Sequence, residues 1–405
     1  MRGSSRLFCG ETSVNARSKP RVAIVSDPLV QRGGAEKIVA DVLARMFPDA
    51  PIYAILYSAA TGPPHIAHRV IPSGLQRIPG AARRHRWLLP FYPAAVESID
   101  LRGFDLIISS HHTAAKGILR SSEQRHICYC HTPMRALWER TQEELADLPA
   151  PLRPIAARAL SRLREWDYAA AGRVDMFVAN SVTTRDRIYR HYGRDSRIVY
   201  PAVDVEHFSL DESVAVGDYY LVASRLVPYK RVGIAIAAAA RLGRRLIIVG
   251  TGPEKLDLKG GHAQYLGHVS DDRLLELIRG CRALIFPGFE DFGMTPVEVM
   301  SCGRPVIAFG KGGALDTVVD GVTGVYAAEQ TVESFADAIV RFESLRFDSG
   351  RIALHAKRFS FSQFESAFSD VVAEVMHGTN RVAAPRESPG RRFRVISGES
   401  LLTRR

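Results

Sequence analysis

Residues Glu290–Glu298 read EDFGMTPVE, and a short apolar run, Ala283–Phe286, precedes them. The run has the length of a buried β-strand, a glycine then favours a turn, and Pro296 suits the first position of a following helix. This arrangement places Glu290 on the loop and Glu298 in the first helical turn, beside backbone N–H groups that can bind an anion or sugar hydroxyls. The stretch predicts a strand–loop–helix unit with a polar site at the carboxyl end of the strand.

Two cations follow another strand-like run. Arg225 and Lys230 come directly after Tyr219–Ala223. An arginine fork can grip two phosphate oxygens, and a lysine supplies a mobile point charge. Taken alone, the pair is most simply explained as surface cations. Together with the two glutamates, it predicts a site for a phosphorylated sugar, with fixed cations stabilising the charge that develops on a leaving diphosphate.

Glycines mark two further turns. Gly33 and Gly34 follow the predicted strand Arg21–Ser26 and open a helix, where absent side chains let the backbone approach a phosphate. A mere tight turn is the alternative explanation for this pair. Gly250 follows the predicted strand Arg245–Val249, and we interpret it as a turn near the nucleotide. Neither place carries the GxGxxG fingerprint of a dinucleotide-binding protein, so a dehydrogenase is not indicated.

His131 directly follows the predicted strand His126–Cys130. A lone histidine is often structural, but the carboxyl end of a parallel strand faces the ligand in an α/β sheet, so we expect His131 to contact the sugar. His111 and His112 are weaker candidates of the same kind. No carboxylate or third ligand is spaced to join them, and no metal site is predicted.

These elements resemble the retaining glycosyltransferases of family 4, which have the GT-B fold. The resemblance runs from about Arg21 to about Met376 in the family's order, and the features that carry it are the Gly33-Gly34 loop, His131, Arg225 with Lys230, and Glu290 with Glu298 as a Glu-x7-Glu motif.

The resemblance implies roles for these side chains. Glu298 is expected to accept hydrogen bonds from the ribose hydroxyls, and Glu290 to contact the hydroxyls of the transferred sugar. His131 is expected close to the anomeric side of that sugar. Arg225, Lys230, Glu290 and His131 are thus the expected catalytic residues. The nucleotide sugar should also meet Gly33, Gly34, Gly250 and the backbone N–H groups of Phe292, Gly293, Met294 and Thr295.

The resemblance also implies a reaction. The sequence around Cys130-His131-Thr132-Pro133 is similar to that of mannosyltransferases of bacterial polysaccharide assembly. A hexose is then transferred from GDP-mannose, or alternatively from a UDP-hexose, to a hydroxyl of a saccharide or polyprenyl-linked acceptor, with retention, no separate cofactor and no divalent metal. A non-hydrolysing nucleotide-sugar epimerase and a non-catalytic nucleotide- or sugar-binding protein remain alternatives.

Length and periodicity set the architecture. The 405 residues exceed the usual size of a single core. Short apolar runs alternate with helical patterns, which predicts an α/β protein with two doubly wound, Rossmann-like domains of parallel strands facing a cleft. The expected order begins with a disordered lead-in (1–19) and ends with a basic disordered tail (377–405). Between them the resemblance implies an N-terminal acceptor domain (20–205), a C-terminal nucleotide-sugar domain (206–360) and a helix crossing back to the N-terminal domain (361–376). The remaining strands are expected at Ile52–Leu56, Phe104–Ser109, Met176–Asn180, Arg197–Tyr200, Gln264–Leu266, Val306–Ala308 and Gly324–Tyr326.

Cysteine usage and hydropathy indicate a compartment. Five cysteines, odd in number and without a CxxC pair, favour a reducing environment. No apolar run approaches the roughly 20 residues of a membrane span, and the N-terminus lacks the apolar core of a secretory signal. We therefore expect a cytoplasmic protein.

The net charge of +11 is compatible with an anionic partner. No nucleic-acid-binding motif is present. The segment Gln76–Pro93 mixes arginines with Trp87 and Phe91, and a basic helix is expected over Leu152–Arg164. This composition suits the surface of an anionic membrane, and an ordinary solvated face is an equally open interpretation.

Overall fold

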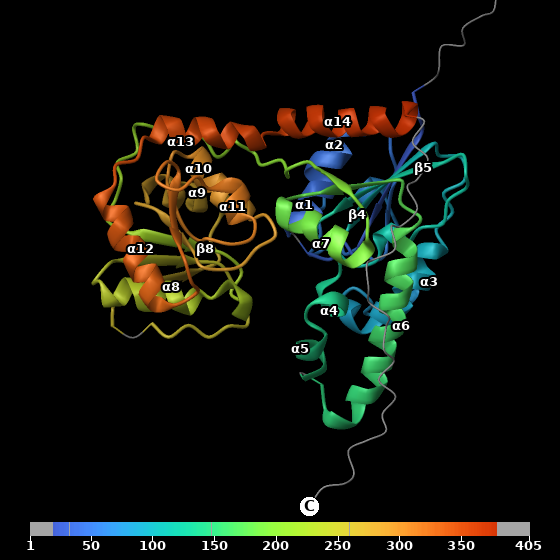
Figure 1. Cartoon of the computed structure of the whole chain (residues 1–405), viewed down its shortest axis with the longest axis horizontal. Coiled ribbons are helices and arrows are strands. Elements are labelled where there is room, and N and C mark those ends of the chain that lie inside the picture. The colour runs from blue at the N-terminus through green and yellow to red at the C-terminus, as the bar shows by residue number, and fades with distance from the viewer. Residues whose placement is uncertain (1–18, 32, 147, 259, 379–405) are drawn as a thin grey trace, which may run out of the picture.

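The computed structural model describes residues 19–31, 33–146, 148–258 and 260–378, which form two α/β units (Figure 1). The first unit is built on a seven-stranded parallel sheet of order β3-β2-β1-β4-β5-β6-β7. Its strands are β1 Val22–Ser26, β2 Ile52–Ala54, β3 Val70–Pro72, β4 Leu106–His111, β5 Arg125–Cys130, β6 Met176–Ala179 and β7 Ser196–Ile198.

The second unit has a six-stranded parallel sheet of order β10-β9-β8-β11-β12-β13. Its strands are β8 Tyr220–Ala223, β9 Leu246–Val249, β10 Ala263–Gly267, β11 Leu284–Phe286, β12 Val306–Phe309 and β13 Gly324–Ala327. In both sheets the winding reverses beside the first strand, at β1/β4 and at β8/β11. Ligands of doubly wound sheets bind outside the carboxyl ends of the strands at such points.

The predicted fold class is confirmed, and one strand was missed. Every expected strand overlaps an observed one, but β3 was not predicted. It is short, lies at the edge of the sheet, and leaves Ile71 and Pro72 exposed, so it shows no buried apolar run. Pro72 is tolerated there because an edge strand does not need every N–H group.

Helices cover both faces of each sheet (Figure 1). The helix predicted to open at Gly33 and Gly34 is a continuous run with a π-helical middle, in which η1 packs Ile38, Val39 and Leu43 into the core. The helices of this unit are α1 Gly34–Lys37, η1 Ile38–Leu43, α2 Ala44–Met46, η2 Ala67–Arg69, η3 Gly74–Arg77, η4 His85–Phe91, α3 Tyr92–Glu97, η5 Ala115–Gly117, α4 Arg135–Trp138, α5 Thr141–Ala146, η6 Ala150–Leu152, α6 Arg153–Ala171 and α7 Val182–Tyr192. The second unit contains η7 Pro228–Lys230, α8 Val232–Arg241, α9 Asp271–Gly280, α10 Met294–Ser301, α11 Ala314–Thr317, α12 Val332–Ser344, α13 Ser349–Ala356 and η8 Lys357–Phe359.

A buried ion pair ties the long helix α6 to the first sheet. The side chains of Lys116 on η5 and Asp167 on α6 pair with each other, and both have 0% exposure. Asp167 also accepts hydrogen bonds from Trp138 Nε1 at 2.7 Å and from the Tyr192 hydroxyl at 2.9 Å. Each polar atom of a buried ion pair needs a hydrogen-bonding partner. This network therefore fixes the orientation of α6 relative to the sheet.

The last helix returns to the first unit, as predicted. α14 spans Phe361–His377 and runs along one side of the molecule after α13 (Figure 1). Phe364 and Phe368 pack edge-on against Tyr129 of β5, with ring centroids 5.6 and 6.3 Å from it.

The chain therefore crosses between the units twice, once after β7 and once before α14. The two crossings lie together, because the Val203 N–H donates a 2.8 Å hydrogen bond to the Phe359 carbonyl. They form one joint between the units.

No helix within the described ranges is long and apolar enough to cross a membrane. The predicted lead-in and basic tail lie outside the described residues except at positions 19, 377 and 378.

Candidate functional site

The loop between β11 and α10 presents the two predicted glutamates, but the helix begins earlier than expected. α10 starts at Met294, after Gly293 with φ 86°. Pro296 is thus the third helical residue rather than the first, and Glu298 lies in the second turn rather than the first. Proline is tolerated at this depth because the first N–H groups of a helix have no partner within it. The N–H groups at the start of α10 consequently face the loop.

Lys230 and Glu290 meet at the carboxyl ends of β8 and β11. Their side chains form an ion pair and are 15% and 21% exposed. The two loops come so close that a Cβ at Gly288 would lie 3.2 Å from the Lys230 Cα. Arg225 lies on the same loop as Lys230 but is exposed, and its guanidinium donates to the Tyr229 hydroxyl at 3.0 Å.

Glu298 points toward the first unit. Its Oε1 is 3.9 Å from Lys37 Nζ. Burial raises the pKa of the Glu298 carboxyl, an effect that Lys37 and His207 oppose. Gly34 of the first unit faces Met294 at the start of α10. Glycine is favoured at position 34, since a Cβ there would lie 3.2 Å from Met294 Sδ. The glycine loop and the start of α10 therefore lie against each other across the two units.

Gly33 and Gly250 have local structural explanations. The Gly33 N–H donates to Glu36 Oε2 at 3.1 Å, so this group is held by its own helix. Gly250 has φ 130°, and a Cβ there would fall 1.8 Å from the Ser224 carbonyl oxygen. The packing of β9 against the end of β8 thus requires glycine, and the role predicted for Gly250 beside a nucleotide stays a prediction.

His131 is almost fully buried at the end of β5. Its Nε2 lies 2.8 Å from Ser110 Oγ, and its ring packs edge-on against Tyr129. Burial, together with the charge of nearby His112, lowers the pKa of His131 to about 3. The imidazole is therefore neutral at pH 7 and can exchange hydrogen bonds but supplies no cation.

Asp27 organises the neighbouring loop and was not singled out from the sequence. Its carboxylate accepts four backbone N–H bonds from residues 112–115 at 2.6–2.9 Å and lies 3.2 Å from His112 Nδ1. Its place after the first strand was the available signal.

Two further carboxylates of the second unit reach the first unit, and these too were missed. Asp291 accepts from Arg135 Nη2 at 2.7 Å and pairs with Arg187. Asp316 accepts from the Val182 N–H of α7 at 3.3 Å, and from the Tyr200 hydroxyl of the crossing segment at 3.1 Å. The site therefore lies between two units that are held together by charged and polar contacts.

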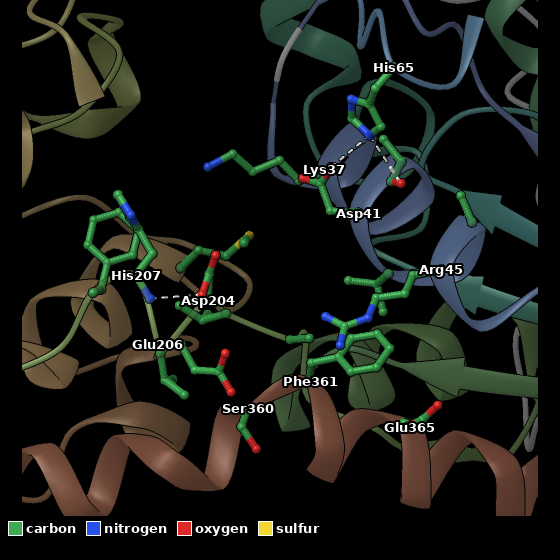
Figure 2. A pocket seen from close by; sticks show the side chains of 18 of the residues that line it. Lys37, Asp41, Arg45, His65, Asp204, Glu206, His207, Ser360, Phe361 and Glu365 are labelled. Carbon is green, nitrogen blue, oxygen red and sulfur yellow. Dashed lines mark hydrogen bonds and ion pairs between the residues drawn. The ribbon is translucent and has the colours of Figure 1, made fainter. Parts of the chain in front are cut away.

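A cavity of about 1080 Å³ opens on the side of this site that lies toward the joint between the units. Figure 2 shows Lys37, Asp41 and Arg45 of the first unit facing the crossing segment, which carries Glu206 and His207. Met294 and Glu298 also line it, whereas Arg225, Lys230 and Glu290 are not among the described residues that do. The cavity thus begins at the predicted ribose-binding glutamate and extends toward the joint. No cluster of three or more metal-ligating side chains occurs in the part of the chain that the structure describes.

Both halves of the chain match models of known protein families. Residues 32–207 match the model described as Glycosyltransferase Family 4, and residues 215–358 match Glycosyl transferases group 1. A D-inositol 3-phosphate glycosyltransferase of Acidothermus cellulolyticus is 30% identical over 315 residues, which cover 67% of this chain and 68% of that protein. The same-named protein of Streptomyces bingchenggensis is 30% identical over 278 residues, covering 58% of this chain and only 59% of its own length.

Other similar proteins include a mannosyltransferase and solved structures. An alpha-1,3/1,6-mannosyltransferase of Dictyostelium discoideum is 36% identical over 117 residues, covering 27% of this chain and 28% of that protein. A structure from Anabaena in complex with UDP superposes with a TM-score of 0.63 at 19% identity, over 87% of this chain and 100% of that one. Sucrose-phosphate synthase from Thermosynechococcus elongatus gives a TM-score of 0.64 at 15% identity, over 87% and 98%. At these identities the structures support the shared fold.

Proposed function

Because this chain belongs to the family 4 glycosyltransferases of GT-B fold, we propose that it transfers a hexose from a nucleoside-diphosphate sugar to a hydroxyl of a saccharide acceptor. The observation that carries the proposal is the pairing of Lys230 with Glu290 at the carboxyl ends of β8 and β11. α10 begins at Met294, four residues after Glu290 in the same loop.

The charges suit the proposed chemistry. As the glycosidic bond to the sugar breaks, negative charge builds on the leaving diphosphate, and Lys230 with Arg225 can stabilise it. A diphosphate that binds Lys230 releases the Glu290 carboxylate from its ion pair, and Glu290 can then accept hydrogen bonds from the sugar. Glu298 is buried beside the cavity and can accept from a ribose. We propose that these groups suffice without a divalent metal and that the anomeric configuration is retained.

The neutral imidazole of His131 fits a hydrogen-bonding role near the sugar. Its pKa of about 3 leaves it uncharged at pH 7, so it does not compete with Lys230 for the diphosphate. With Nε2 held by Ser110, the ring orientation is fixed. We assign it the side of the sugar that faces the first unit.

GDP-mannose is the first donor we propose, and a UDP-hexose is the alternative. The mannosyltransferase relative supports the former, and the UDP complex of a protein with this fold supports the latter. A polyprenyl-linked saccharide of bacterial polysaccharide synthesis is the acceptor class we propose.

Thermal stabilisation by GDP, UDP, ADP and dTDP, each with and without EDTA, tests the donor site. A selective rise in melting temperature that persists in EDTA supports a metal-independent diphosphate site and identifies the base. No rise with any of them contradicts the proposal. An epimerase would convert the sugar nucleotide to its epimer without acceptor, which NMR of the donor detects.

We further propose that the first unit rests on an anionic membrane. On η4, Trp87 is 74% and Phe91 is 56% exposed, and Ile155 at the start of α6 is 65% exposed. Exposed Arg83 and Arg84 accompany the aromatic residues. Aromatic side chains at the interface and arginines on the headgroups are typical of peripheral binding.

Co-sedimentation with vesicles containing phosphatidylglycerol tests this proposal. Replacing Arg83, Arg84 and Arg86 by Gln should weaken binding, by about 1 kcal/mol for each charge near the surface. The matched control replaces three exposed arginines of the second unit, Arg241, Arg273 and Arg346. Equal losses in both triple variants, or none, would contradict a specific docking face.

A further inference from the structure

Asp291 stands next to Glu290 and is held by two arginines of the other unit. Arg135 on α4 reaches its Oδ2 at 2.7 Å, and Arg187 on α7 pairs with its Oδ1. The side chains of Arg135, Arg187 and Asp291 are 24%, 9% and 14% exposed. We refer to these three residues as the clasp.

The clasp is fixed on the side of the first unit. Arg187 Nε donates to Glu139 Oε1 of the first unit at 2.7 Å. Burial by itself raises the pKa of Glu139, but His191 and Arg187 outweigh it and lower the pKa to about 2. Glu139 therefore remains ionised and keeps Arg187 in place.

The same arginine lies between the two segments that carry the proposed chemistry. Arg187 Nη1 is 3.4 Å from Oγ1 of Thr132, the residue after His131, and it pairs with Asp291, the residue after Glu290. One buried guanidinium thus links the residue after His131 in one unit to the residue after Glu290 in the other.

Within its own unit, the loop that carries Glu290 is held through its backbone. The Gly313 N–H donates to the Glu290 carbonyl at 2.9 Å, and Gln330 Nε2 donates to the Pro287 carbonyl at 2.7 Å. These bonds anchor the main chain. Asp291 supplies the charged contact that makes the position of this loop depend on the first unit.

We propose that Asp291 is a positioning residue, which through Arg135 and Arg187 sets the loop of Glu290 only when the two units are together. Closure of the cleft and placement of the glutamate at the donor sugar are then a single event. The inference rests on the proposed transferase function for its kinetic consequence, but the geometric part stands without it.

Four variants test the clasp. Asp291→Asn and Arg135→Gln remove its charges, and Arg135→Lys retains the positive charge as a rescue. Asp320→Asn is the matched control, because it breaks a carboxylate–arginine pair with Arg341 elsewhere in the second unit. Each is compared with the wild-type chain for thermal melting, so that a variant that fails to fold is recognised.

Hydrogen exchange at the backbone amides of loop residues 288–292 is the first readout. We expect exchange about tenfold faster in Asp291→Asn, somewhat less in Arg135→Gln, and near the wild-type rate in Arg135→Lys and Asp320→Asn. The double variant Arg135→Gln/Asp291→Asn should exchange no faster than Asp291→Asn, because the shared carboxylate is already lost. Wild-type exchange in Asp291→Asn overturns the proposal.

Release of nucleoside diphosphate from UDP-glucose and from GDP-mannose, with water taking the hexosyl group in place of a saccharide hydroxyl, is the second readout. We expect kcat in Asp291→Asn to fall about 10- to 30-fold while KM for the donor changes less than threefold, with Arg135→Lys close to wild type. A raised KM at unchanged kcat overturns the positioning role. If the wild-type chain releases nothing from either sugar nucleotide, the proposed function fails, and the exchange experiment still determines whether the clasp exists.

Discussion

Replacing Lys230 by Met should weaken the binding of nucleoside diphosphates far more than that of the corresponding monophosphates. Lys230 is 15% exposed and points its charge at the carboxylate of Glu290. A unit charge about 4 Å from a phosphate oxygen contributes about 4 kcal/mol at an effective dielectric constant of about 20. Part of this attraction is offset, because Lys230 must first leave its ion pair.

A net contribution of about 2–3 kcal/mol remains, which corresponds to about 30- to 160-fold in the dissociation constant. Isothermal titration calorimetry with UDP or GDP, whichever the stabilisation panel selects, measures this loss. The monophosphate of the same base should lose less than threefold, since Lys230 is assigned to the leaving diphosphate. Lys357→Met, which removes an exposed lysine on η8, is the control.

An equal loss for the mono- and diphosphates would show that Lys230 acts on the nucleoside or on folding. Unchanged diphosphate binding would refute the assignment of Lys230 to the phosphates. In either case the pairing with Glu290 would need another explanation.

Glu298→Gln should abolish the preference for a ribonucleoside diphosphate over its 2′-deoxy analogue, and a preference that persists in calorimetry would contradict a ribose contact. Burial keeps the pKa of His126 and of His131 at about 3, against 6.5 in the unfolded chain. The unfolded chain therefore takes up protons that the folded chain refuses, and stability should fall by about 2 kcal/mol per histidine between pH 7 and pH 5. In urea unfolding of His126→Gln, the free energy of unfolding should therefore fall less between pH 7 and pH 5, by about 2 kcal/mol, than in the wild-type chain. The same fall as in the wild type would contradict the low pKa of His126. Lys116→Met leaves the buried carboxylate of Asp167 without its cation and should cost about 3–5 kcal/mol in urea unfolding; a cost below about 1 kcal/mol would mean that water reaches the pair.

Local sequence pattern was sufficient for most of the fold. Buried parallel strands such as β9 and β12 are short apolar runs, and a run of this kind followed by glycine is visible without any structure. β3 escaped because an exposed edge strand lacks that signal. The start of α10 was misplaced because proline fits the third helical position as well as the first.

The site was predictable only in part. Each unit's own segment, with Lys230 or Glu290 at the end of a strand, could be recognised, because the carboxyl end of a strand is a local property. Contacts across the cleft could not be recognised from the sequence. Arg135 and Asp291 are 156 positions apart in sequence, and nothing local selects this pair from 54 basic and 43 acidic residues.

The return of α14 to the first unit has a consequence for synthesis on the ribosome. Tyr129 of β5 is fully buried, and it is covered by Phe364 and Phe368 from the end of the chain. The second unit, from β8 to α13, is continuous in sequence and can fold as soon as it emerges. The first unit, although translated earlier, must wait for the last helix to complete its core. We therefore expect the nascent N-terminal half to depend on chaperones until α14 has been translated, in reverse of the usual order in which the earlier domain is finished first.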